Sequence, residues 1–153
     1  MELDRELLSH MLEAFMNYVD EAIVDEDLGD MLFTPRLLPH PKNGYVVLEY
    51  LGDRRKDTIK HIEEDCAKSG FIVDASQPIV EIENDIDEDE LEDKFEEEFG
   101  EPITSVEAIF DELYKTCYVF YVETMQHLPV QVQEKRKAKL EEMKRDLYNK
   151  FLA

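Results

Sequence analysis

The stretch DIDEDELEDKFEEEFGE, residues 85–101, decides how the middle of this chain folds. It combines a dense run of Asp and Glu with one lysine and two phenylalanines. Three interpretations compete: a metal-binding loop, a disordered acidic segment, and a folded helix with an anionic surface. Each interpretation makes a different requirement of the few non-acidic residues, so these residues can distinguish the three.

The metal-binding interpretation starts from a match to the calcium-binding loop of an EF-hand. The stretch has carboxylates at positions 1, 3, 5, 9 and 12 of that loop, namely Asp85, Asp87, Asp89, Asp93 and Glu96. Glu90, however, stands at position 6, where the loop needs glycine for its sharp turn. A strand-like segment at 78–83 also precedes the stretch, where a helix should enter. We therefore predict no specific metal site and no cofactor.

The apolar residues of the stretch favour a helix over a disordered segment. Leu91, Phe95 and Phe99 are four residues apart, so they share one face of a helix. A disordered acidic segment has little use for two phenylalanines at this spacing. We predict a helix over about 87–99 that these three residues dock onto the core. Its like-charge pairs at i,i+4 each cost ~0.2–0.5 kcal/mol, so their presence favours a role in binding.

The net charge of −21 is confined to two segments of the chain. Residues 1–30 hold 10 acids and one base, and residues 81–101 hold 13 acids and one base. The other two segments are balanced, with 7 acids and 7 bases in 31–80 and 8 of each in 102–153. A charge excess that served only solubility would be spread more evenly. The segregation instead indicates surfaces that attract a positively charged partner.

We predict a non-catalytic acidic protein that binds a basic protein, such as a nucleic-acid-binding protein or a toxin. It would act as a nucleic-acid-mimicking inhibitor or as an antitoxin or immunity-type neutraliser. A helical second segment would carry one acid per ~2.4 Å of axis, against one charge per ~1.7 Å in duplex DNA. The same charge disfavours direct binding to nucleic acid or to anionic membranes. The predicted partner-binding residues are Asp85, Asp87, Glu88, Asp89, Glu90, Glu92, Asp93, Glu96, Glu97, Glu98 and Glu101.

Two alternatives stay open. The first is an acidic chaperone for a secreted or nucleic-acid-binding client, which would need a large apolar groove and a persistent homodimer. The second is a divalent-metal-binding or enzymatic α+β domain. The sequence contains no nucleophile, phosphate-loop or metal-ligand motif. His61 and Asp65, four residues apart, are typical of a surface ion pair, so we predict no catalytic residue.

The remaining patterns predict a single α+β domain, residues 1–153, whose C-terminal part is a helical hairpin at about 104–151. Apolar periodicity predicts an amphipathic N-terminal helix over about 3–25. Three prolines and Asn43-Gly44 then indicate a loop of irregular structure.

The next segment predicts a small sheet with one crossover helix. A strand at 45–51 precedes a helix that Asp53 would cap and Gly70 would close. Segments 71–74 and 78–83 are predicted as two further strands, or as one strand broken near Pro78, and complete either a βαβ unit or a small α+β sheet.

Two long helices are predicted for the C-terminal part. Thr104 and Glu107 match a capping box at the start of the first helix. Its segment 117–122 is apolar nearly all round, which also fits a strand after a shorter helix. We favour the helix because neither glycine nor proline interrupts residues 103–128. After Pro129 a last helix is predicted over 130–151.

The chain has the features of a cytoplasmic protein. Its acidic N-terminus resembles no secretory signal peptide, and no apolar run approaches the ~18 residues of a membrane span. Cys66 and Cys117 lack the spacing of paired metal or redox ligands. We therefore expect free thiols and a reducing compartment.

Overall fold

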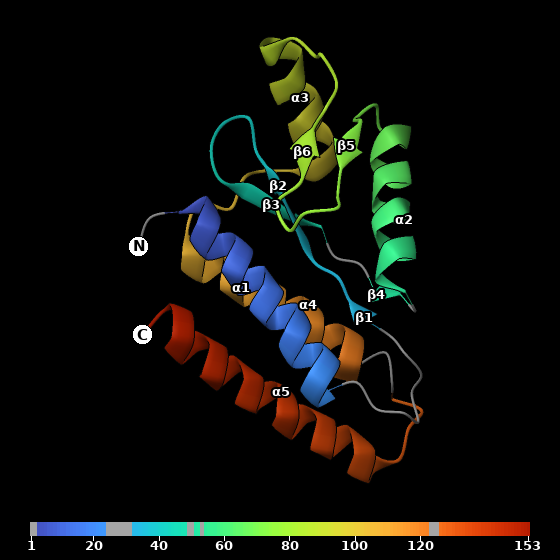
Figure 1. Cartoon of the computed structure of the whole chain (residues 1–153), viewed down its shortest axis with the longest axis vertical. Helices are drawn as coiled ribbons and strands as arrows, with labels where there is room; N and C mark the ends of the chain where they lie inside the picture. Colours follow the sequence, from blue (N-terminus) through green and yellow to red (C-terminus); the bar gives the residue numbers. More distant parts are fainter. Residues whose placement is uncertain (1–2, 24–31, 49–50, 53, 123–125) are drawn as a thin grey trace.

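The α+β class is confirmed by the computed structural model, which describes residues 3–23, 32–48, 51–52, 54–122 and 126–153. Two layers are visible, with a β-hairpin between them (Figure 1). The helical layer consists of α1 (Arg5–Tyr18), its continuation η1 (Val19–Ile23), α4 (Val106–Val122) and α5 (Val130–Phe151). The second layer consists of α2 (Arg55–Lys68), β5 (Val73–Asp74), β6 (Glu81–Ile82) and α3 (Glu88–Phe99).

The proline-rich segment before Gly44 is a hairpin arm, so the prediction of an irregular loop was wrong. It contains β1 (Leu32–Phe33) and β2 (Arg36–Pro39), which pair antiparallel with β4 (Leu51–Gly52) and β3 (Tyr45–Leu48), respectively. The two pairs keep one register, because equal numbers of residues separate them on the two arms. Each strand has only two to four residues, which is too few for a readable alternation of polar and apolar residues in the sequence. The strand predicted at 45–51 appears as β3 and β4, and residues 49–50 lie outside the described part.

The hairpin forms a wall between two apolar cores. Leu37 belongs to the helical core, whereas Leu38 and Val46 belong to the second core, because successive side chains of a strand point to opposite faces. The backbone of Leu37 also forms hydrogen bonds to the segment that precedes β6. Its N–H donates to the Pro78 carbonyl at 2.9 Å, and its carbonyl accepts from the Val80 N–H at 2.8 Å. The backbone thus ties the second layer to the hairpin.

The two cores are built from the apolar faces that the sequence predicts. Burying one large apolar side chain contributes ~1.5–3 kcal/mol, so both cores add substantially to stability. The helical core includes Leu8, Met11, Leu12, Phe15, Val19, Ile109, Phe110, Leu113, Cys117, Leu140, Met143 and Leu147. The second core includes Ile62, Cys66, Phe71, Val73, Ala75, Val80 and Phe95.

The strands around α2 follow the second of the two predicted arrangements, a small α+β sheet. β5 pairs antiparallel with β6, with Val73 opposite Ile82. Parallel pairing is limited, within the described residues, to one isolated bridge between Leu37 and Ile79. Gly70 follows α2 with a φ of +89°, as expected of a residue that closes a helix. The predicted cap, Asp53, lies outside the described residues.

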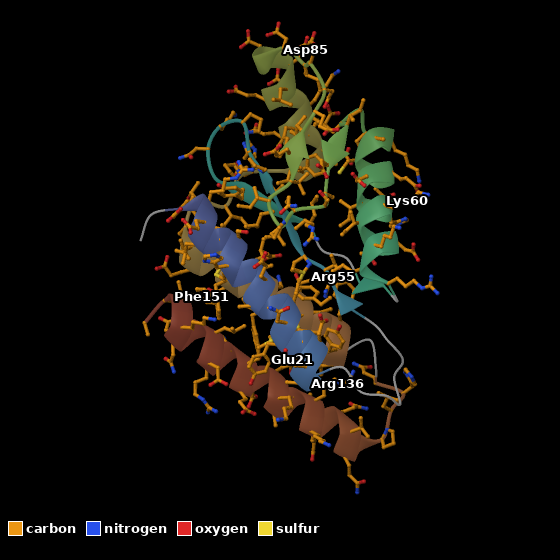
Figure 2. The ribbon with its side chains drawn as sticks, in the orientation of Figure 1. Glu21, Arg55, Lys60, Asp85, Arg136 and Phe151 are labelled. Carbon is orange, nitrogen blue, oxygen red and sulfur yellow. The ribbon has the colours of Figure 1, made fainter. Side chains whose placement is uncertain are left out.

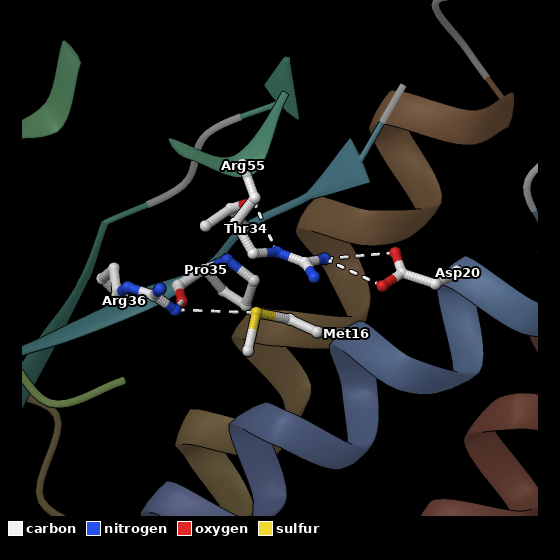
Figure 3. Close-up of polar contacts among 6 residues, drawn as sticks. All are labelled: Met16, Asp20, Thr34, Pro35, Arg36 and Arg55. Carbon is white, nitrogen blue, oxygen red and sulfur yellow. Dashed lines mark hydrogen bonds and ion pairs between the residues drawn. The ribbon is translucent and has the colours of Figure 1, made fainter. Parts of the chain in front are cut away.

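The N-terminal helix differs from the prediction at its C-terminal end. Regular α-helix stops at Tyr18 and continues as the π-helical turn η1; the predicted residues 24–25 lie outside the described part. η1 carries Asp20, whose two carboxylate oxygens each accept a hydrogen bond from Nη2 of Arg55 at 3.1 Å (Figure 3). This pair joins the helical layer to the first turn of α2.

A second arginine, Arg36, is almost completely buried beside this pair (Figure 3). Its Nε donates to the Ala75 carbonyl at 2.9 Å, and its Nη1 donates to the Pro35 carbonyl at 3.1 Å and to the Met16 sulfur at 3.6 Å. Burial, and then the nearby charge of Arg55, lower the pKa of Arg36 to about 10. The guanidinium therefore stays charged at neutral pH and links strand β2 to both layers.

The cap of α4 is one residue later than predicted. The Ser105 hydroxyl accepts a hydrogen bond from the Ala108 N–H at 3.1 Å, which is the geometry of an N-cap. The capping box of Thr104 and Glu107 is therefore wrong. The helix itself is as favoured: residues 117–122 are helical, and α5 spans Val130–Phe151 as predicted. Among the described helices, none is both long and apolar enough to cross a membrane.

Replacing the capping serine should destabilise the protein, and replacing its neighbour should not. We expect Ser105→Ala to lower the free energy of unfolding by about 1 kcal/mol, because it removes the acceptor for a helix N–H. The matched control Thr104→Ala, on an exposed side chain, should change it by less than about 0.5 kcal/mol. Urea unfolding followed by circular dichroism measures both. A larger loss in Thr104→Ala would restore the capping box.

Candidate functional site

The acidic helix predicted from the sequence is α3, and it docks through the residues expected. Phe95 is fully buried, and Leu91 and Phe99 are half-buried beside it. The Phe95 ring centroid lies 4.8 Å from that of Phe99 and 6.0 Å from that of Phe71. The His40 ring meets the Phe95 ring edge-on, with the two centroids 4.7 Å apart. α3 is thus held on the second core by one aromatic cluster.

Polar contacts tie the C-terminal half of α3 to the turn between β2 and β3. Nδ1 of His40 accepts from the Lys42 backbone N–H at 3.1 Å, so Nε2 carries the proton and donates to the Gly100 carbonyl at 3.1 Å. The Lys42 ammonium contacts Oε1 of Glu96 at 2.7 Å. That hydrogen bond raises the pKa of Lys42. No local pattern in the sequence pointed to these roles of His40 and Lys42.

The predicted contact residues form one acidic surface, the α3 surface. Asp89, Asp93 and Glu97, four residues apart, make a row on the side of the helix opposite Phe95. Glu96 differs from the rest because it pairs with Lys42. The exposed members are Asp85, Asp87, Asp89, Glu90, Asp93, Glu97, Glu98 and Glu101, and the half-buried ones are Glu92 and Glu96. The side chain of Glu88 lies outside the described part.

A second acidic row leads into α3, and the sequence interpretation included only its last two carboxylates, Asp85 and Asp87. From residue 81 to 87 the chain alternates between exposed carboxylates and more buried side chains, which is the period of an extended strand. We call this row the 81–87 edge. Its carboxylates are Glu81, Glu83, Asp85 and Asp87. The alternation is visible in the sequence EIENDID, so attention to period two there would have added Glu81 and Glu83.

An ion pair joins the two acidic segments of the chain. Nη2 of Arg5, the single base of residues 1–30, lies 3.3 Å from Oε1 of Glu81, the first acid of residues 81–101. The start of α1 therefore adjoins the start of the 81–87 edge. Asp20, from the same first segment, instead pairs with Arg55.

The backbone of residues 85–96 differs from that of a calcium-binding loop. Helical structure begins at Glu88, so most of the matched calcium-loop frame cannot wrap around one ion. Within the described residues, no group of three His, Cys, Asp or Glu side chains is arranged to hold a metal. His61 and Asp65 form the predicted exposed pair at 3.4 Å.

The acidic surface lies at one tip of the molecule. Figure 2 shows Asp85 at that tip and Arg136 of α5 toward the opposite end. α3 carries eight acids and one base, whereas α5 carries four acids and seven bases. The acid-rich helix α3 and the base-rich helix α5 therefore lie toward opposite ends of the molecule. Comparisons with protein-family models, with curated proteins and with solved structures found no match for this chain.

Proposed function

We propose that this protein is a non-catalytic binding protein whose α3 surface engages a basic surface of another protein. The observation that carries this proposal is the burial of Phe95, because it makes α3 a docked helix rather than a free acidic tail. The carboxylates are therefore held in place before a partner arrives, which lowers the entropic cost of binding. The net charge of −21 would also steer a basic partner toward the protein.

Among basic partners, a protein that binds nucleic acid fits best. α3 contains eight acidic residues among its twelve, or one per ~2.3 Å of helix axis. This density is of the same order as the charge density of duplex DNA, one per ~1.7 Å. A nucleic-acid-mimicking inhibitor should compete with DNA or RNA for its target. An antitoxin or immunity-type neutraliser would use the same surface on a basic toxin without that competition.

The chaperone alternative has less support from the exposed apolar residues. In the described part, the large exposed hydrophobic side chains are one on α4, two that are 18 residues apart on α5, and one just before β5. They are Ile72, Val119, Val130 and Tyr148.

A cytoplasmic location belongs to the same proposal. Both cysteines are free and buried. Burial raises the pKa of Cys66 to about 11 and raises that of Cys117 further, which keeps both thiols protonated. Two free thiols suit a reducing compartment.

Neutralising three exposed acids of the α3 surface should abolish binding of basic proteins. We expect the variant Glu90→Gln, Asp93→Asn, Glu97→Gln to lose most of the basic proteins that the immobilised wild type retains from host lysate. These side chains are exposed, so the fold should persist. Retained proteins are identified by mass spectrometry at low and high salt. Wild-type retention should fall steeply with salt, because screening weakens charge attraction.

A matched control removes the same charge from another surface. Glu107→Gln, Asp111→Asn, Glu141→Gln changes three exposed acids of α4 and α5 and should bind like the wild type. Equal losses in both variants would mean that net charge, and not the α3 surface, controls binding. Retention of only neutral or acidic proteins by the wild type would refute the proposal. Release of the retained protein by added duplex DNA would identify the mimic.

A further inference from the structure

The start of α1 and the segment that leads into β6 enclose an open groove of about 570 Å³. Buried Pro78 and Ile79 lie in its lining, and Asp4, Glu6 and Glu81 bring three carboxylates to it. Ligand sites typically have volumes of ~300–1,000 Å³ and combine an apolar lining with a few polar groups. The groove is large enough for more than one side chain.

The three carboxylates of the groove differ in the hydrogen bonds and ion pairs that they already form within the protein. Asp4 caps α1, because its Oδ1 accepts from the Glu6 N–H at 3.0 Å. Glu81 pairs with Arg5, but both side chains are more than half exposed, at 72% and 55%. Such exposed pairs contribute little net stability, so a cation from outside can replace Arg5. The Glu6 carboxylate forms no hydrogen bond or ion pair with another described side chain.

The lining matches an arginine side chain in both of its parts. The aliphatic stem of arginine can lie along the narrow apolar strip that Pro78 and Ile79 leave accessible in the groove, while the charged head stays among polar groups. Its planar head pairs with a carboxylate through two parallel hydrogen bonds, which an ammonium cannot do. Glu81 and Glu6 supply such carboxylates on opposite walls, one from β6 and one from α1.

The groove is continuous with the surface of the proposed function. Glu81 lines the groove and is also the first carboxylate of the 81–87 edge, which leads directly into α3. An extended chain that places one side chain in the groove could therefore continue along the edge, where exposed acids recur at every second residue.

We propose that this groove is the anchor site for an arginine-bearing extended segment of the basic partner. The proposal rests on the proposed function and specifies where and through which residue type the partner is gripped. In the free protein Arg5 occupies Glu81, and on binding the arginine of the partner takes its place. Arg5 thus acts as an internal competitor that keeps weaker cations out.

The test uses a fluorescein-labelled peptide of alternating arginine and glycine, with binding measured by fluorescence anisotropy. The variant Glu6→Gln, Glu81→Gln should bind the peptide about five- to tenfold more weakly than the wild type, because two exposed charge pairs are lost. Its matched control, Glu134→Gln, Glu141→Gln on α5, removes the same charge from exposed positions elsewhere. The control should differ from the wild type by less than about twofold, since only long-range attraction changes.

Arg5→Ala gives an independent test, because a gain of binding cannot come from a folding defect. It should tighten peptide binding about two- to fivefold by freeing Glu81, whereas Arg145→Ala on α5 should not. The groove is refuted if the Glu6/Glu81 variant binds like its control or if Arg5→Ala fails to tighten binding. In that event, loss of binding in the Glu90/Asp93/Glu97 variant would leave the proposed function standing. Unchanged binding in that variant as well would refute both.

Discussion

Phe95→Ala should lower the free energy of unfolding by about 3–5 kcal/mol, the usual cost of removing a buried phenylalanine. The ring is fully buried and is the centre of the cluster formed with His40, Phe71 and Phe99. Its loss leaves a cavity beneath a helix whose eight carboxylates repel one another. We therefore also expect α3 to detach and peptide binding to weaken. Urea unfolding and anisotropy measure the two effects.

Two further variants sharpen this prediction. Phe95→Leu keeps most of the apolar volume and should cost clearly less than the alanine change. Ile72→Ala removes an exposed side chain of the same layer and should cost less than about 0.5 kcal/mol. A loss below about 1 kcal/mol in Phe95→Ala would show that other contacts hold the helix. Full peptide binding by an α3 that has detached would show that docking does not matter for function.

Gly44→Ala should destabilise the protein by about 3 kcal/mol or more, through two separate effects. The residue has a φ of +79°, where a side chain costs ~1–2 kcal/mol. A Cβ at this position would also overlap the carbonyl oxygen of Ile103. That oxygen accepts the Tyr45 N–H at 3.0 Å, and the Tyr45 carbonyl accepts the Ile103 N–H at 2.7 Å. The overlap would therefore push the segment between α3 and α4 away from the hairpin turn.

Gly70→Ala isolates the first of these effects, the cost of a side chain at positive φ. Gly70 has nearly the same φ, +89°, but a Cβ there would meet no atom within 4 Å. The free energy of unfolding of Gly70→Ala should fall only by the cost of a side chain at positive φ, about 1–2 kcal/mol. The difference between the two urea midpoints then reports the contact with Ile103. Equal losses would mean that the hairpin turn adjusts without cost.

The sequence predicted elements well where a single pattern was long enough to dominate. α5 is a helix of 22 residues with a regular apolar face and a preceding proline, and its limits were correct. α3 was identified because three large apolar residues at helical spacing outweigh the charge around them. Strands β1 and β2 were missed because two to four residues beside prolines show no readable period.

The candidate site likewise has one part that the sequence predicted and one part that it did not. The α3 surface follows from local spacing, whereas the support from His40 and Lys42 depends on contacts between residues about 55 positions apart, such as Lys42 with Glu96. The groove requires α1 and β6 to be brought together by the fold. Such long-range contacts leave no trace in the spacing of a single sequence. Glu81 and Glu83 are the exception, because their alternation could have been recognised.

The hairpin wall has a consequence for how the molecule unfolds. Leu37 and Leu38 are adjacent and insert into different cores, so a slip of the ladder by one residue would bring Arg36 or Pro39 to one of the two leucine sites. The side chains at these two positions therefore select the correct pairing. The turn at Gly44 and the hydrogen bonds of buried Arg36 favour the same alignment. Since both layers depend on that one alignment, neither can melt alone, and unfolding should be a single all-or-none transition.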